Sequence, residues 1–153
     1  MNLRDKMQVK MRMEGVAISH ARTDVTIRGL TTVIDEPIER GGTNLGFSPT
    51  ETMVAALIGC TNVIAHKIAH KNGIALTSMT IRIEADFDRR GVTLNEAVAI
   101  PFPAMTMIVD VTTPATSAAV DRVREELALY CPIAAIVRAS GTVLTEVWNI
   151  TQA

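Results

Sequence analysis

Apolar and polar residues alternate near the start of the chain, and this pattern predicts strands. Residues 8–13 place Val9, Met11 and Met13 on one face and basic residues on the other, which indicates a half-exposed strand. Residues 14–15 are typical of a turn, and residues 16–19 are predicted to return as a second strand. A third extended segment, 24–34, is interrupted at Gly29, and a glycine-rich loop follows over residues 36–47.

A long helix is predicted next. Ser48 suits the N-cap position, Pro49 the first helical position, and Glu51 can close a capping box. The helix is expected to end near residue 72, with Gly73 as its stop signal. Residues 53–65 carry no charge on any face, and a helix that is apolar all round is buried all round. One chain of this size cannot easily wrap such a helix, so we expect a homodimer that buries this segment.

The second half of the chain predicts four further strands, one of them short, and two helices. Strands are expected at 76–86, 105–112 and 142–151, with a short edge strand at 97–103. A helix should cover residues 114–130, and a shorter one, 133–139, is opened by Pro132 and stopped by Gly141. The inward face of the first of these helices is predicted to hold Ala118, Val120 or Ala119, Val123, Leu127 and Tyr130. The order of elements indicates one α+β domain spanning residues 1–153.

Composition narrows the function. The 153 residues are 48% hydrophobic with a formal net charge of −1, and no basic run is present, so neither nucleic acid nor membrane is an expected partner. No segment reads as a membrane span, and the N-terminus lacks the apolar region of a secretory signal. We therefore expect a cytoplasmic protein in a reducing compartment, where two cysteines are either core residues or a redox pair.

Cys60 and Cys131 are the candidates for chemistry. Cys60 falls in an apolar helical stripe, where a single cysteine is usually an inert small hydrophobe. Cys131 is predicted to lie where one helix ends and the next begins, and free N–H groups there favour a thiolate. Its position is explained equally well if it is an interior residue at the helix junction with no chemical role.

Other polar residues are better explained structurally. The capping box accounts for Glu51, which is nine residues from Cys60 and so lies on the opposite side of a straight helix, about 13 Å along its axis. His66 and His70 share one helix face, but no further ligands are evident, so a solvated helix end is the better interpretation and no metal is expected. Gly41 and Gly42 lack the lysine of a phosphate loop, and nothing supports a serine hydrolase.

Two motifs carry a resemblance to a known family. The segment from Ser48 to Cys60, SPTETMVAALIGC, resembles the central helix of the OsmC/Ohr superfamily, and Gly41-Gly42 resembles the loop that precedes it. The segment LYCPI around Cys131 resembles the second cysteine site of that family. The spacing of the cysteines and the order of elements also agree, so the resemblance covers nearly the whole chain.

The resemblance implies an OsmC/Ohr-like fold, antiparallel sheets with a long central buried helix and a second helix, in an intertwined homodimer. It implies a thiol-dependent organic hydroperoxide reductase in stress defence, without a cofactor. Cys60 would attack a small organic hydroperoxide, Cys131 would resolve the sulfenic acid as a disulfide, and a dithiol would reduce the pair.

The sequence departs from the best-characterised peroxidase branch of the family at two points. Thr50 stands where that branch has a carboxylate directly after the proline, and Glu51 follows one position later. The Gly-Arg turn that supplies a thiolate-stabilising arginine is absent, which leaves Arg22 as the first candidate and Arg40 as the second. An alternative function is therefore a non-catalytic OsmC-like protein that binds an apolar ligand at the dimer interface.

Overall fold

The computed structural model describes residues 8–153, which form two compact units. The N-terminal unit ends at Met53, and the C-terminal unit comprises residues 54–153. The single domain expected over residues 1–153 stays a prediction.

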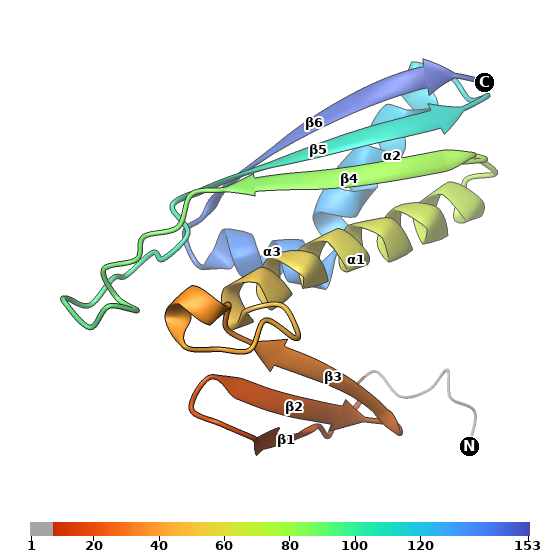
Figure 1. Cartoon of the computed structure of the whole chain (residues 1–153). Helices are drawn as coiled ribbons and strands as arrows, with labels where there is room; N and C mark the ends of the chain where they lie inside the picture. The colour runs from red at the N-terminus through yellow and green to blue at the C-terminus, as the bar shows by residue number, and fades with distance from the viewer. Residues whose placement is uncertain (1–7) are drawn as a thin grey trace. The chain divides into compact units, whose positions relative to one another are not determined.

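The N-terminal unit contains one antiparallel sheet in the order β1-β2-β3 (Figure 1). Its strands are β1 (Glu14–Ala17), β2 (Arg22–Ile27) and β3 (Leu30–Asp35). Arg28 and Gly29 both have positive φ angles, 53° and 77°. A two-residue turn of this handedness matches the twist of the strands it joins, so the predicted break at Gly29 is confirmed as a hairpin.

The predicted strand at residues 8–13 is wrong, as is the predicted turn at residues 14–15. Residues 8–13 are exposed and form no strand, and Glu14 and Gly15 lie within β1. The turn lies further along, where the Ser19 hydroxyl accepts the N–H groups of Ala21 and Arg22 at 3.2 and 3.0 Å. Because this side-chain-stabilised turn sets the hairpin, the strand before it falls on residues 14–17.

The loop after β3 is held by a buried carboxylate. Asp35 accepts, through one oxygen, the backbone N–H and hydroxyl of Thr43 at 3.0 and 2.6 Å and the N–H of Leu45 at 3.1 Å. The loop contains the short 3-10 helix η2 (Ile38–Arg40). A Cβ atom at Gly42 would lie 1.7 Å from the Glu36 carbonyl oxygen, so only glycine allows this close approach.

Helix α1 (Pro49–Lys71) confirms the predicted start and stop signals. The Ser48 N–H donates to a Glu51 carboxylate oxygen at 2.8 Å, and the Glu51 N–H donates to the Ser48 hydroxyl at 3.4 Å, which is a capping box. Gly73 follows the last turn with φ of 68°.

The C-terminal unit contains a mixed three-stranded sheet. Its strands are β4 (Ser78–Ala85), β5 (Ala104–Thr113) and β6 (Val143–Gln152), in that order. β4 and β5 are antiparallel, but β5 and β6 are parallel. The expectation of antiparallel sheets is therefore wrong for this sheet, because α2 (Ser117–Tyr130) and α3 (Pro132–Ala139) form the crossover that a parallel pair requires.

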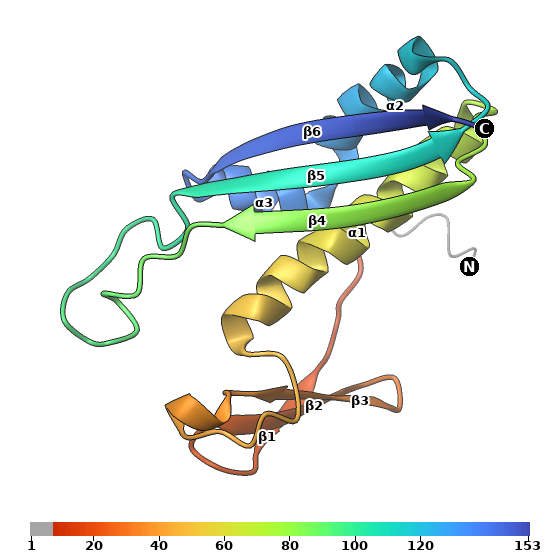
Figure 2. The same ribbon diagram turned by 45° about the horizontal axis from the view of Figure 1, so that its top comes forward.

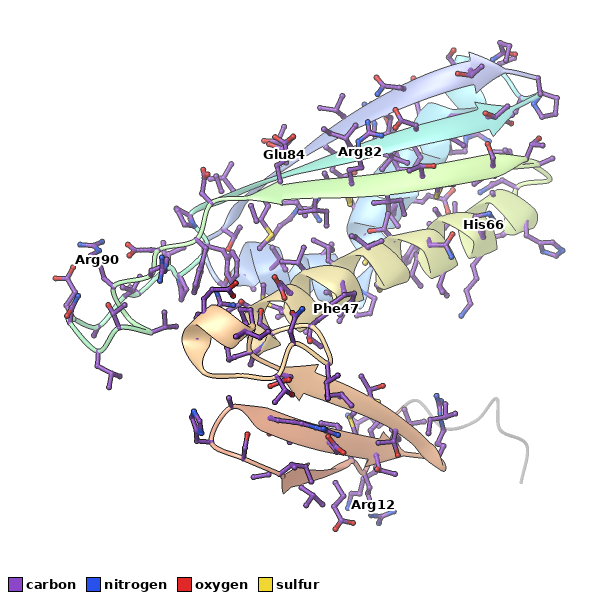
Figure 3. The ribbon with its side chains drawn as sticks, in the orientation of Figure 1. Arg12, Phe47, His66, Arg82, Glu84 and Arg90 are labelled. Carbon is purple, nitrogen blue, oxygen red and sulfur yellow. The ribbon has the colours of Figure 1, made fainter. Side chains whose placement is uncertain are left out.

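A loop, and not the predicted edge strand, occupies residues 97–103. Phe102 leaves the sheet register and stacks on Phe87 with ring centroids 4.9 Å apart. The flanking prolines, which cannot donate to a ladder, explain why no strand forms. The whole connection between β4 and β5, residues 86–103, also carries Arg90, labelled in Figure 3, which pairs with Asp88 and Glu96.

All three helices lie on one face of the C-terminal sheet (Figures 1 and 2). Arg82 and Glu84 project from its other face (Figure 3). On α2 the buried positions are Val120, Val123 and Leu127, whereas Ala118 and Tyr130, which were expected inside, are exposed. The core joins residues from the helices and the sheet, among them Leu57, Ala65, Ile68, Met105, Val123, Leu127, Ala134 and Val137.

Helix α1 is not buried all round within one chain. Leu57, Thr61, Ala65, Ile68 and Ala69 are buried, while Gly59 and Val63 are exposed. By length and composition alone the helix could cross a membrane, which the sequence pattern did not predict. Its buried face contributes to the core, however, and the core helix of a soluble protein meets the same criteria.

Candidate functional site

Two cysteine side chains meet inside the C-terminal unit. The Cys131 thiol donates to the Cys60 sulfur with the two Sγ atoms 3.1 Å apart, and both cysteines are free. A disulfide bond is about 2.05 Å long, so a small movement of either side chain would bring the sulfurs into bonding distance. The paired motifs predict this proximity, although 71 positions separate the two residues.

The position of Cys131 follows from a break between two helices. Its N–H donates to the Leu127 carbonyl at 3.0 Å and closes α2, while its carbonyl accepts the N–H of Ala135 at 3.0 Å in α3. Pro132 cannot continue α2 but suits the first position of α3. The cysteine is therefore held rigidly at the junction.

Burial favours the protonated form of the Cys131 thiol. Only 1% of its surface is exposed, and this desolvation raises the pKa of the Cys131 thiol. The N–H groups of Ile133 and Ala134 at the start of α3 act in the opposite direction on that pKa, but they do not outweigh burial. The neighbouring Cys60 sulfur raises the Cys131 pKa further.

Cys60 has a more open setting. It is half-buried in the middle of α1 and packs against the hydrophobic core together with Val54 and Ile64. Within residues 8–153 no cluster of three histidine, cysteine or acidic side chains could hold a metal ion. The two thiols lie adjacent to one another, and Cys60 packs against the hydrophobic core that includes Cys131.

Arg22 lies on β2 of the N-terminal unit and is already paired. Its guanidinium donates two parallel hydrogen bonds to Asp24, at 2.8 and 3.0 Å. The hydrogen bond to Asp24 raises the pKa of Arg22. Arg40, the second candidate, forms an ion pair with Glu36 one helical turn away. Both candidate arginines thus have carboxylate partners within their own unit.

Glu51 serves as the second half of the capping box. The N–H and hydroxyl of Ser48 hold the pKa of the Glu51 carboxyl below its usual range, and the charge of Arg40 lowers it further. Thr50 lies 3.3 Å from the Ser48 hydroxyl. The structure therefore brings Cys60 and Cys131 together, while Arg22 and Glu51 have local structural partners.

The sequence did not predict an ion pair between α3 and β6. Arg138 on α3 and Glu146 on β6 are paired at 2.5 Å, and the Trp148 indole donates to the other Glu146 oxygen at 3.3 Å. The alternation along β6 could have indicated this pair, because Glu146 lies on the same inward face of the strand as Leu144 and Trp148. His66, labelled in Figure 3, is exposed on α1 as expected. His70 is exposed on the same helix.

The site is therefore a pair of adjacent free thiols on an α+β scaffold, with half-buried Cys60 on a long helix and buried Cys131 at a helix junction. Residues 42–146 match the family of OsmC-like proteins. The chain belongs to this family.

Solved structures show the same fold at low sequence identity. An OsmC-like protein from Mycoplasma pneumoniae superimposes with a TM-score of 0.74 at 13% identity, covering 96% of this chain and 99% of that one. An organic hydroperoxide resistance protein OsmC from Legionella pneumophila gives 0.69 at 14%, covering 94% and 99%. An organic hydroperoxide resistance protein from Elizabethkingia anophelis gives 0.69 at 13%, covering 95% and 99%. No curated protein sequence matches the chain.

Proposed function

We propose that the protein is a thiol-dependent peroxidase that reduces small organic hydroperoxides. The observation that carries the proposal is the 3.1 Å separation of the Cys60 and Cys131 sulfurs in their free form. Family membership supports it, as do two structural relatives that are named for organic hydroperoxide resistance.

The two cysteines take different roles in this proposal. The Cys60 thiolate attacks one peroxide oxygen, the O–O bond breaks, and the alcohol leaves after taking up a proton. Cys60 then carries a sulfenic acid. Cys131 attacks that sulfur, an S–S bond forms, and the hydroxyl leaves as water. The assignment rests on exposure, because half-buried Cys60 is the more accessible thiol and Cys131 is almost fully buried with a raised pKa.

A dithiol completes the cycle. One of its thiolates attacks the Cys60–Cys131 disulfide, its second thiol displaces the resulting mixed disulfide, and the reductant leaves as a disulfide. Repeated reduction requires a compartment that supplies dithiols, which agrees with the proposed cytoplasmic location. The hydrophobic core against which Cys60 packs favours peroxides with hydrocarbon substituents over hydrogen peroxide.

We also propose that the active form is a homodimer. The support is the uncharged segment of α1 whose Gly59 and Val63 are exposed in the single chain. In this arrangement Arg22 and Glu51 act as supporting residues of the thiol site, with Arg40 as the alternative cation.

A second candidate function is the binding of an apolar ligand without catalysis. It is favoured by the two hydrogen bonds from Arg22 to Asp24 and by the capping role of Glu51, since a thiolate needs a cation that is free to stabilise it. The two candidates differ in whether the thiols are consumed by peroxide.

Turnover of cumene hydroperoxide with dithiothreitol tests the proposal. Cys60→Ser should abolish turnover, because an alcohol cannot replace the thiolate. Cys131→Ser should still consume one equivalent and should then overoxidise under excess peroxide. Glutathione should support a lower rate than the dithiol. The peroxidase proposal fails if the wild-type protein consumes no peroxide and Cys60 is alkylated only at strongly alkaline pH. The binding of an apolar ligand would then be the preferred function.

A further inference from the structure

The Cys60 sulfur accepts one side-chain hydrogen bond within residues 8–153, and its donor is the other cysteine. The Cys131 thiol makes this bond with the two Sγ atoms 3.1 Å apart. The hydroxyl of Thr61, the next residue on α1, donates instead to the Met107 sulfur at 3.3 Å. A thiol becomes a strong nucleophile by ionising, and a donor at the sulfur favours the ionised form. The donor that reaches Cys60 therefore bears on its reactivity.

The charged side chains of the elements that form the core around Cys60 are engaged elsewhere. On α2, Glu126 pairs with Lys71 at the far end of α1, and on α3 Arg138 pairs with Glu146 of β6. Tyr130, next to Cys131 in the sequence, is exposed. The residues that β4 and β5 direct towards the helices are uncharged, namely Met79, Ile81, Ile83, Met105, Met107, Val109 and Val111. The core thus offers Cys60 no charged partner among these residues.

Cys131 is suited to keep its proton and to donate it in a hydrogen bond. It is 1% exposed, and burial raises the pKa of its thiol, whereas Cys60 is half-buried. Of the two thiols, Cys60 is therefore the one that ionises first. The backbone of Cys131 is fixed on both sides, since its N–H donates to Leu127 and its carbonyl accepts from Ala135, each at 3.0 Å. The donor thus starts from a fixed point at the junction of α2 and α3.

From this arrangement we propose that Cys131 is a positioning residue for the nucleophile, whose S–H group donates a hydrogen bond to the Cys60 thiolate and stabilises it before peroxide reacts. The inference rests on the proposed thiol chemistry, and it gives Cys131 a role that precedes its attack on the sulfenic acid. The proton stays on Cys131 while Cys60 attacks the peroxide, so no bond to Cys131 breaks in that step. Arg22 and Arg40 are paired with carboxylates, and this donor needs neither of them.

The pH profile of Cys60 alkylation tests the proposal without peroxide. The reduced full-length chain is treated with iodoacetamide across a range of pH, and modification of the Cys60 peptide is followed by mass spectrometry. Cys131→Ala removes the donor and should raise the pH midpoint by about one unit, which slows alkylation at neutral pH about tenfold. Cys131→Val also lacks a donor but leaves less empty space, and it should give the same rise. Cys131→Ser keeps a hydroxyl donor on the same Cβ and should give a smaller rise.

Val137→Ala is the matched control, because Val137 is a buried residue of α3 in the same core and carries no donor. This variant should leave the midpoint unchanged. A midpoint that stays the same or falls in Cys131→Ala and Cys131→Val would overturn the proposal. An equal rise in Cys131→Ser, or in Val137→Ala, would also overturn it, because packing and not the donor would then be the cause. Failure of the peroxidase function has a different signature, namely the expected alkylation profiles in a protein that consumes no cumene hydroperoxide.

Discussion

The two units of the chain are stabilised in different ways. In the C-terminal unit the fully buried side chains are mostly aliphatic or methionine, and they pack three helices against a sheet. In the described part of the N-terminal unit the buried residues are Asp35 and Ser48, both polar, while Leu30, Leu45 and Phe47 are exposed. The N-terminal unit thus relies on hydrogen bonds made by a few polar groups, and the C-terminal unit relies on apolar burial. Apolar surface left open on the N-terminal unit and on α1 is the kind of surface that a partner subunit covers.

The largest effect on stability should come from the core of the C-terminal unit. Leu127→Ala removes a side chain that is 1% exposed and leaves a cavity in the core of the C-terminal unit. We expect a loss of about 2–5 kcal/mol in the free energy of unfolding, measured by urea denaturation. Leu129→Ala is the control, since Leu129 is on the same helix but is 76% exposed, and it should change stability little. Equal losses from both would show that Leu129 is also covered in solution.

A large side chain on the exposed face of α1 should disrupt the proposed dimer. No atom lies within 4 Å of a Cβ built at Gly59, so a larger side chain fits the single chain. Gly59→Arg should convert the proposed dimer to a monomer in sedimentation, because the arginine occupies the place of the partner. Gly59→Ala is the control and should remain dimeric. A wild-type chain that sediments as a monomer would contradict the dimer.

The stability of the loop after β3 should depend on pH, because the Asp35 carboxylate holds the loop. Hydrogen bonds from Thr43 and Leu45 lower the pKa of the Asp35 carboxyl in the folded state. Its contribution to stability is therefore present above the pKa of an unfolded aspartate and is lost as pH falls through the lower, folded pKa. The protection factors of the Thr43 and Leu45 amides against hydrogen exchange should fall over that acidic range. Asp35→Asn should already exchange quickly at neutral pH, and an acid response unchanged in this variant would exclude Asp35 as its cause.

A smaller effect is expected at the start of α1. Ser48→Ala removes the hydroxyl that receives the Glu51 N–H and should cost about 1 kcal/mol in the free energy of unfolding. Ser48→Thr retains a capping hydroxyl and should lose less. A cost well above this in thermal unfolding would indicate that Ser48 has a role beyond the cap.

Local rules of sequence predicted much of the fold. The start of α1 at Pro49 and the break at Cys131-Pro132 follow from capping and proline chemistry, which act between near neighbours. Alternation alone misplaced the first strand, because the Ser19 hydroxyl set the turn. The parallel pairing of β5 and β6 was also missed, since strand direction depends on the whole crossover and not on the pattern of either strand.

The candidate site was only partly predictable. The two cysteine motifs indicated that Cys60 and Cys131 would meet, and their sulfurs do. The partners of Arg22 and Glu51 depend on which neighbouring oxygen each side chain reaches, and here those oxygens belong to Asp24 and Ser48. Residue type alone therefore suggested roles for Arg22 and Glu51 without showing that both have structural partners.

The stoichiometry of a single oxidation decides whether Cys60 and Cys131 act as a redox pair. The reduced chain, freed of reductant, is treated with one equivalent of cumene hydroperoxide, and thiols and intact mass are measured. If Cys60 and Cys131 form the proposed redox pair, both thiols are lost, the mass decreases by two hydrogen atoms, and a peptide joins Cys60 to Cys131. Retention of both thiols, or gain of oxygen without a disulfide, would contradict it.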